Sequence, residues 1–323
     1  MRKVFFVLLI FVFLYFVYFT ITSLYIKYPI LNKTIDISKG SSVFQIAKKL
    51  EQKEIISSAS LFLVANKLLP NDKQIRYGKF NFTGKYSFVD VLHKLTSGEV
   101  VTNRITVPEG YTVRHIASLL ARQELADYNT FMSLCSDSSF IDSLGLPIKN
   151  LEGFLFPETY YIPYFADEKY IIQMMVDNFF LQFENVHPNP VSFDSLYDAV
   201  IMASIVEREA IYDDERPLIA GVYNKRLKER MLLQADPTVA YALELNRISR
   251  KKIYYDDLKI QSDYNTYLYR GLPPTPICNP GIQSILAAIH PQDTDYLFFF
   301  AGKNNRHIFS KTYQEHLKKL NRI

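Results

Sequence analysis

The hydrophobic pattern of the chain begins with one long apolar run. Residues 4–26, a stretch of 23 positions, contain no charged side chain. A helix of that length rises about 35 Å, which is enough to cross the hydrocarbon core of a bilayer. Arg2 and Lys3 precede the run and favour a cytoplasmic N-terminus. Since no small-residue cleavage motif follows, we expect an uncleaved single-pass anchor rather than a signal peptide.

A second pattern is an internal repeat of apolar positions. Residues 39–50 align with residues 109–120 at an offset of 70, and five of the twelve positions are identical. The apolar positions recur at i, i+3, i+4 and i+7, which is one face of a helix. Ser42 and Thr112 lie where helix N-caps are expected, and a short extended run precedes each copy. The alternative to two related strand–turn–helix modules is chance similarity between two amphipathic helices.

The third pattern is an almost wholly apolar run at residues 199–206, which predicts a helix over 195–211 that is buried on most sides. Proline and glycine become frequent from about residue 151, and polar motifs appear between long apolar segments. This change of character predicts a domain boundary near residue 150.

The expected fold class is therefore α+β, with three segments along the chain. A cytoplasmic stub and transmembrane helix occupy residues 1–27, and small β/α modules with the internal repeat occupy residues 28–150. A mixed α+β domain occupies residues 151–323.

Composition excludes several classes of protein. Hydrophobic residues make up 48% of the 323 positions and charged residues 22%, which excludes a disordered tail or a polytopic membrane protein. The net charge of +4 is not concentrated in any segment, so no nucleic-acid partner is expected. Cys135 and Cys278 lack the spacing of a zinc site or a disulfide framework. We expect neither a metal nor a cofactor.

Glu207 is the first candidate for chemistry, because it ends the buried helix on its apolar side. Burial and the negative end of the helix dipole both raise a carboxyl pKa, which favours the protonated form that a general acid requires. Glu209 points about 200° away around the helix and is expected to be solvated. The alternative for Glu207 is a structural role, paired with Arg208, Arg216 or another base.

Four loops combine aromatic, amide and carboxyl side chains with turn residues: 151–160, 234–239, 263–267 and 271–281. Each loop alone is ordinary turn chemistry. Together, downstream of a membrane anchor, they indicate a groove for a polar polymer. Tyrosine rings and asparagine amides suit a sugar, because rings stack on its face and amides bond its hydroxyl and acetamido groups.

In their order along the chain these motifs resemble the MltG (YceG-like) endolytic murein transglycosylase family. The resemblance runs from the anchor to near the C-terminus. It is carried by six segments: 107–120, 151–162, 203–210, 218–243, 264–281 and 287–299.

The resemblance implies a cell-membrane anchor, a LysM-like region before the catalytic region, and one catalytic glutamate. By the motif ASIVEREA at 203–210 this glutamate is Glu207. The implied reaction cuts the β-1,4 bond between N-acetylmuramic acid and N-acetylglucosamine without water and leaves a 1,6-anhydromuramyl end. It needs one protein carboxylate, whereas ordinary glycosidases need two. The substrate-binding candidates are Gln234, Asp236, Thr238, Tyr264, Asn265, Glu158 and Tyr160. A second acid from Asp236 or Glu158 stays open.

The implied partners are peptidoglycan glycan strands, the membrane, and peptidoglycan synthases beside which the protein would terminate strand elongation. The catalytic region would then lie outside the cytoplasm, in the periplasm or its equivalent. Two alternatives remain. A hydrolytic muramidase would leave reducing ends, and a non-catalytic peptidoglycan-binding or divisome scaffold would work without Glu207.

Overall fold

The computed structural model describes residues 2–38, 40–68, 75–97, 101–164, 166–248, 250 and 252–322. The chain forms two compact units, Met1–Arg104 with Tyr161–Ala166, and Ile105–Tyr160 with Asp167–Ile323. The compact units thus divide near residue 104, whereas the sequence predicted a boundary near residue 150. The difference arises because the second copy of the repeat packs within the second unit. The division of function between 28–150 and 151–323 stays a prediction.

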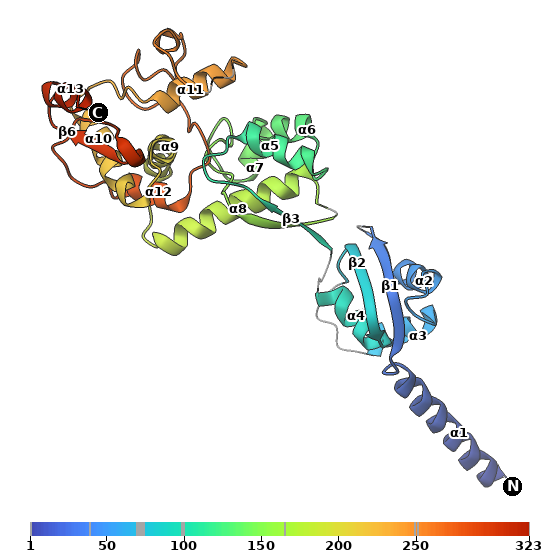
Figure 1. Cartoon of the computed structure of the whole chain (residues 1–323). Coiled ribbons are helices and arrows are strands. Elements are labelled where there is room, and N and C mark those ends of the chain that lie inside the picture. The colour runs from blue at the N-terminus through green and yellow to red at the C-terminus, as the bar shows by residue number, and fades with distance from the viewer. Residues whose placement is uncertain are drawn as a thin grey trace. The chain divides into compact units, whose positions relative to one another are not determined.

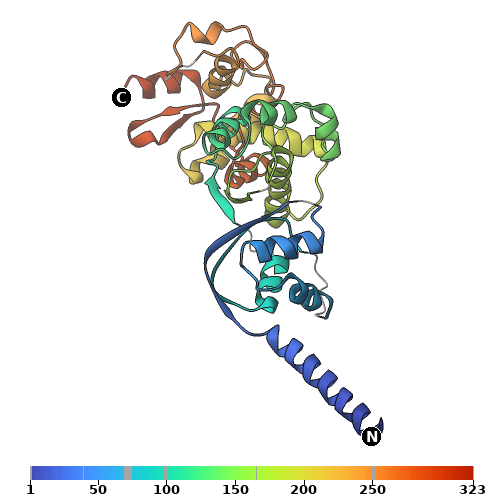
Figure 2. The ribbon, with the colours of Figure 1, turned by 90° about the vertical axis from the view of Figure 1, so that its right-hand side faces the viewer.

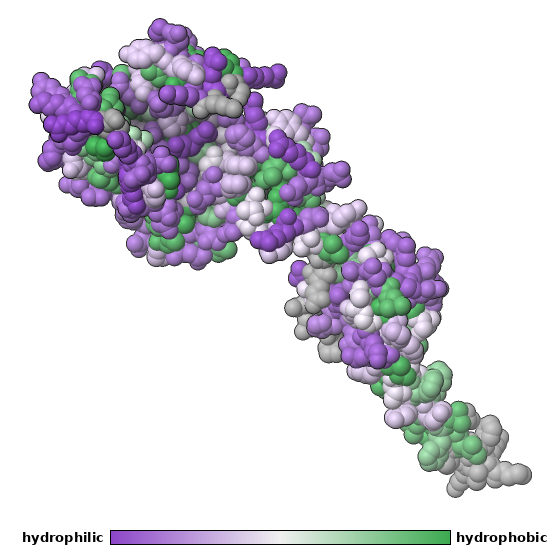
Figure 3. Space-filling model, in the orientation of Figure 1, coloured by the Kyte–Doolittle hydropathy of each residue, from purple (hydrophilic) through white to green (hydrophobic). Residues whose placement is uncertain are grey.

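The first unit begins with helix α1 (Arg2–Ser23). Its described side chains, such as Phe11, Phe13 and Tyr15, are mostly apolar and exposed. Figure 3 shows hydrophobic surface along the described part of this helix. Across the part of the chain that the structure describes, no helix is both long enough and apolar enough to span a membrane. The predicted anchor therefore stays a prediction.

The rest of the first unit packs three helices with a two-stranded antiparallel sheet (Figures 1 and 2). Strand β1 (Tyr28–Ile37) pairs with β2 (Gly78–Tyr86), and the register shifts between Ile30 and Lys33. The helices are α2 (Val43–Gln52), α3 (Ala59–Leu68) and α4 (Phe88–Ser97). Their apolar faces and those of the strands share one core, which includes Ile35, Leu50, Phe62, Phe80 and Leu95.

The two copies of the repeat form the same local structure. Gly40 and Gly110 both adopt positive φ, at 83° and 76°. Ser42 and Thr112 then cap α2 and α5 (Val113–Arg122), each in a reciprocal capping box. The cap satisfies the first free N–H groups of each helix, which fixes where the helix begins. The predicted turn and helix therefore form in both copies.

The similarity continues beyond the aligned residues. Helix α6 (Tyr128–Leu134) follows α5 as α3 follows α2. Strands β3 (Thr102–Thr106) and β4 (Thr159–Pro163) then form a two-stranded sheet, as β1 and β2 do. Each copy thus places two helices between a pair of strands, and the second copy also contains α7 (Ser138–Ser143).

The second unit is built around helix α9 (Phe193–Glu209), close to the predicted range of 195–211. Residues 200–206 of α9 are buried, and the helix packs against α10, α11 and α12. The other elements are α8 (Glu168–Val186), α10 (Arg216–Lys228), α11 (Asp236–Leu245), α12 (Ile282–Ile289), α13 (Tyr313–Leu320), β5 (Phe298–Ala301) and β6 (His307–Ser310). The mixed α+β class is confirmed.

The hairpin of β5 and β6 closes one side of the unit. Its strands are antiparallel, with Phe299 opposite Phe309. Phe299 packs edge-on against Tyr223 of α10. Arg226 fixes the start of the hairpin, because its Nε donates to the carbonyl oxygen of Leu297 at 2.6 Å. The hairpin is thereby held against the face of α10 that carries these two side chains.

Candidate active site

Two glutamates leave the last turn of α9 in different directions. The helix ends at Glu209, and Ala210 continues as extended chain. Glu207 and Glu209 are two positions apart, so their side chains point to different sides of the helix. Each carboxylate consequently meets a different set of neighbours.

The Glu207 carboxylate is enclosed by donors. Its side chain is 6% exposed, and Oε1 lies 3.2 Å from Nη1 of Arg216. Oε2 accepts hydrogen bonds from Oγ of Ser284 at 2.8 Å and from the backbone N–H of Gly281 at 3.0 Å. Charge-assisted bonds of this kind stabilise the ionised carboxylate. The structure therefore shows the pairing with Arg216 that the sequence left as an alternative, and the protonated acid expected from burial stays a prediction.

The same cluster holds two further carboxylates. Nε of Arg216 lies 2.9 Å from Oδ1 of Asp213. Partial burial, with the nearby charge of Glu207, raises the pKa of Glu109. A Cβ atom at Gly281 would overlap the Glu109 carboxylate, so a larger residue there would require the Glu109 side chain to move. The cluster therefore links α9, α10, the start of α12 and the turn at Glu109, and its contacts hold these elements together.

The Glu209 carboxyl group has a different environment. Oε1 accepts a hydrogen bond from the hydroxyl of Tyr223 at 2.7 Å. Burial raises the pKa of Glu209 to about 7, and the charge of Asp236 adds to the shift. The prediction that Glu209 is solvated was wrong. Tyr223 covers the side of α9 that the isolated helix pattern presents to water.

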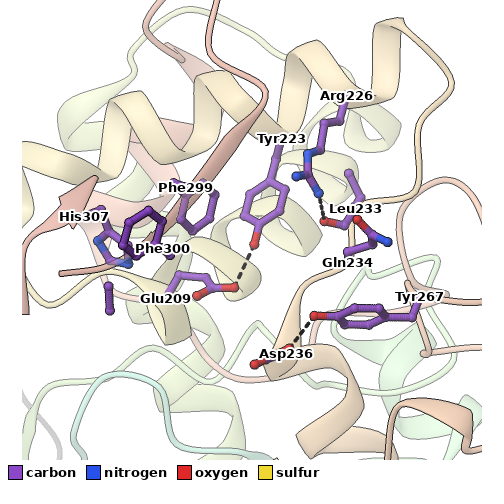
Figure 4. A pocket seen from close by; sticks show the side chains of 11 residues that line it. Glu209, Tyr223, Arg226, Leu233, Gln234, Asp236, Tyr267, Phe299, Phe300 and His307 are labelled. Carbon is purple, nitrogen blue, oxygen red and sulfur yellow. Dashed lines mark hydrogen bonds between the residues drawn. The ribbon is translucent and has the colours of Figure 1, made fainter. Parts of the chain in front are cut away.

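Glu209 also lines a polar cavity of about 330 Å³ (Figure 4). The cavity combines carboxyl, hydroxyl, amide and guanidinium groups with aromatic rings, the groups that recognise sugars. Its lining consists of Glu209, Tyr223, Arg226, Leu233, Gln234, Asp236, Tyr267, Phe299, Phe300, Ala301 and His307. Figure 4 shows Glu209 and Asp236 around the same space, with the Tyr267 hydroxyl donating to Oδ1 of Asp236 at 2.6 Å.

Two of the predicted substrate residues line this cavity. Gln234 has a left-handed backbone, with φ of 51°, which ends the preceding turn. Asp236 then begins α11, followed by a proline that suits the first helical turn. The turn between α10 and α11 therefore presents both side chains beside Glu209.

Thr238 and Asn265 are fully buried and support the loops around the cavity. The Thr238 hydroxyl donates to the carbonyl oxygen of Ala235 at 2.8 Å. Nδ2 of Asn265 donates to the carbonyl oxygens of Leu258 and Ile260, both at 2.9 Å. Both side chains thus bond to backbone carbonyl oxygens of neighbouring loops, and their predicted role in substrate binding stays a prediction. The sequence could not separate a loop-stabilising amide from a sugar-binding one.

The other three predicted residues lie outside the cavity lining. The Tyr264 hydroxyl is 2.8 Å from Oγ1 of Thr275. Tyr160 is 6% exposed, and its hydroxyl donates to a carbonyl oxygen at 2.6 Å, so it too is an internal support. Glu158 is exposed and accepts the N–H of the next residue at 2.8 Å. Their roles in substrate binding stay predictions.

Sequence reasoning missed Tyr223, Arg226 and Tyr267 as cavity residues. Tyr223 and Arg226 are spaced i, i+3, which places them on one face of α10, the face toward the hairpin. That spacing was a usable signal, since a tyrosine and an arginine on one buried face of a helix require partners. Tyr267 follows the Tyr264–Asn265 pair by two positions in the same loop.

Sequence reasoning also missed Glu152, a buried carboxyl group beside the site. Its oxygens accept hydrogen bonds from the Val113 N–H at 3.0 Å, Nδ2 of Asn279 at 3.1 Å and the Tyr241 hydroxyl at 3.2 Å. Burial raises the pKa of Glu152 to about 8. The group ties the start of α5 to the loops that precede α8 and α12.

Comparison with known proteins gives concordant matches. The profile described as the YceG-like family matches residues 35–322. A Bacillus subtilis protein named endolytic murein transglycosylase is 35% identical over 306 residues, covering 88% of this chain and 82% of the relative. A protein of the same name from Streptococcus pneumoniae is 29% identical over 315 residues, but the chain spans 56% of its length. The crystal structure of a yceG-like protein from Listeria monocytogenes has a TM-score of 0.60 and 33% identity, covering 89% of this chain and 99% of that one.

Proposed function

The chain belongs to the YceG-like family, and we propose that it is an endolytic peptidoglycan lytic transglycosylase. The substrate bond would be the β-1,4 linkage between N-acetylmuramic acid and N-acetylglucosamine. The observation that carries this proposal is a carboxyl group with a pKa near neutral in a polar, aromatic cavity. Such a group can both donate and accept a proton at physiological pH.

We propose Glu209 as this acid and base, in preference to the Glu207 of the sequence prediction. Glu209 lines the cavity and has one hydroxyl donor, from Tyr223. Glu207 has three donors, including the guanidinium group of Arg216, and does not line that cavity. An acid must reach the glycosidic oxygen, and Glu209 borders a cavity that can hold the substrate, with a pKa raised to about 7.

The proposed reaction uses this one carboxyl group twice. Glu209 first gives its proton to the glycosidic oxygen, and the bond from that oxygen to C1 of the muramyl residue breaks. The substrate's own acetamido oxygen stabilises the positive charge at C1. The Glu209 carboxylate then takes the proton of the muramyl 6-hydroxyl group as O6 bonds to C1. No water is consumed, so a second carboxylate at a fixed distance is unnecessary.

The proposal includes a membrane anchor and a cell-wall location. The uncharged run at residues 4–26 and the helical conformation of Arg2–Ser23 support a single-pass anchor with a cytoplasmic N-terminus. We propose that residues 28–150 form a LysM-like region that holds glycan outside the cytoplasm. An anchored enzyme of this kind would cut strands close to their site of synthesis and so terminate elongation beside the peptidoglycan synthases.

The test is a digest of purified peptidoglycan by the full-length protein in membranes, beside its Glu209→Gln variant. Mass spectrometry of the fragments should find ends lighter by one water than hydrolysed ends, and the variant should lack them. Reducing ends would replace the proposal with a hydrolytic muramidase. Binding without cleavage by the wild type would favour the scaffold.

A further inference from the structure

A second cavity lies in the same unit as Glu209. Its volume is about 460 Å³, and α5, α9, α11 and the segment after α11 supply its lining. The charged and titratable lining residues are Arg114, His115, Arg208, Glu244, Arg247 and Arg250. Four guanidinium groups thus face one carboxylate.

The positive charge of this cavity is only partly compensated. Arg250 pairs with Asp257 at 3.4 Å, and Glu244 accepts a hydrogen bond from the Thr112 hydroxyl at 3.2 Å. Among the described residues, the side chains of Arg114, Arg208 and Arg247 form no hydrogen bond or salt bridge. Like charges gathered around a half-enclosed space repel one another, and an anion in that space would relieve the repulsion.

Arg208 gives an independent indication of a ligand. Its Nη1 atom has no exposed surface and no hydrogen-bond partner among the described residues. The charge of Arg208 acts on Glu152, but the oxygens of Glu152 already accept bonds from other donors. A buried guanidinium nitrogen without an acceptor is costly, so an acceptor close to Arg208 would stabilise the protein.

We propose that this arginine cavity binds carboxylates of the peptide stem attached to the muramyl residue of the substrate. The inference rests on the proposed function and extends it from the glycan to the peptide. Arginine suits the task because its planar fork bonds both oxygens of a carboxylate.

Two helices, α9 and α11, contribute residues to both cavities. Arg208 directly precedes Glu209 in α9, and α11 lines both cavities, with Asp236 in the first and Glu244 in the second. The eight steps from Asp236 to Glu244 rise about 12 Å along the helix. An extended peptide of four residues spans about 13 Å. A stem on a muramyl residue held at Glu209 therefore has the length to reach the arginines.

The experiment compares two soluble, uncrosslinked glycan substrates, one with its peptide stems and one stripped of them by an amidase. Full-length wild type should cleave stemmed strands with the higher kcat/KM. The variants Arg114→Gln and Arg247→Gln should each lower the ratio of the two kcat/KM values about tenfold, the effect of losing one charged hydrogen bond. Arg122→Gln is the matched control, because Arg122 is exposed on the same helix as Arg114 but lies outside the cavity.

An unchanged ratio in both variants, with unchanged melting temperatures, would overturn the stem assignment. Inorganic phosphate is the second probe, and it should inhibit cleavage of stemmed strands more than that of stripped ones. Equal inhibition of both would assign the cavity to a phosphate group instead. If wild type cleaves neither substrate, the proposed function fails, but tighter retention of stemmed strands that Arg114→Gln abolishes would still support the peptide site.

Discussion

Glu207 and Glu209 lie in the same turn of α9, but their side chains have different environments within the second unit. Around Glu207, a guanidinium group, a hydroxyl and a backbone N–H occupy the carboxylate oxygens. Around Glu209, one tyrosine hydroxyl donates, and the rest of the group borders a cavity of about 330 Å³. The first region joins helices, and the second leaves room for a ligand.

The difference shows that helix position alone does not determine what a buried carboxyl group does. The partners come from α10 and α12, which are separate helices that follow α9 in the chain. Where they supply a cation and donors, the carboxylate is held in a network of bonds between helices. Where they supply burial and one hydroxyl, the pKa of Glu209 rises to about 7 and the proton becomes exchangeable near neutral pH.

The largest expected effect separates the two glutamates by activity. Glu209→Gln should lower the rate of anhydro-end formation about 1,000-fold, because it removes the only group that gives and takes the proton. Glu207→Gln should keep most of the rate per folded molecule. Turnover of soluble glycan strands, normalised to folded protein by circular dichroism, measures both. Equal losses of rate in the two variants would contradict the assignment of the catalytic role to Glu209 alone.

The next effect is on stability, where the substitution of Glu207 should cost more than that of Glu209. Glu207→Gln leaves the buried guanidinium of Arg216 without its main counter-charge and should lower the free energy of unfolding by about 3 kcal/mol. Glu209→Gln should change it by less than about 1 kcal/mol, since Gln still accepts the Tyr223 hydroxyl bond. Urea denaturation followed by intrinsic tyrosine fluorescence gives the comparison. A more stable Glu207→Gln protein would contradict the structural role.

The third expected effect is a pH dependence of stability that comes from Glu152. Burial raises its pKa from 4.5 to about 8, so the folded protein binds this proton more tightly than the unfolded chain does. Stability should therefore fall as pH rises from about 5 to 8, by on the order of 2 kcal/mol from this group. Glu152→Gln should flatten that part of the curve. Urea midpoints at pH 5.5 and 8.5 test it, and an unchanged slope in the variant would contradict the assignment.

The smallest effect concerns the cavity wall. Tyr267→Phe removes the hydroxyl that donates to Asp236 at 2.6 Å and should weaken cleavage about fivefold, the effect of one lost hydrogen bond near 1 kcal/mol. Tyr264→Phe is the control, because its hydroxyl contacts Thr275 outside the cavity lining. Steady-state kcat/KM on the same strands is the measurement. A larger loss of kcat/KM for Tyr264→Phe would indicate that the substrate binds nearer to Tyr264 than to Tyr267.

Local sequence patterns predicted much of the fold. The capped helices after Gly40 and Gly110 and the buried helix ending near Glu209 follow from periodicity and from the chemistry of N-caps, which act over three or four residues. The boundary of the compact units did not follow, because it depends on which core the second repeat copy joins. Long-range packing of that kind leaves no local signal.

The candidate site shows the same limit. The motifs named Gln234 and Asp236, which line the cavity, and their role in substrate binding stays a prediction. They could not distinguish Glu207 from Glu209, since the distinction depends on Arg216 and Tyr223 of another helix. They also could not show that Asn265 turns inward to backbone carbonyls.

The most direct test of the central claim is the pH dependence of kcat/KM, measured for wild type and Glu207→Gln on soluble glycan strands. The profile reports the acid of the free enzyme, provided that each rate is normalised to the folded protein present at that pH. Since the protonated form of Glu209 is required, kcat/KM should fall as pH rises through about 7, in both proteins alike. A decline that shifts or disappears in Glu207→Gln would assign the catalytic proton to Glu207 and contradict the account.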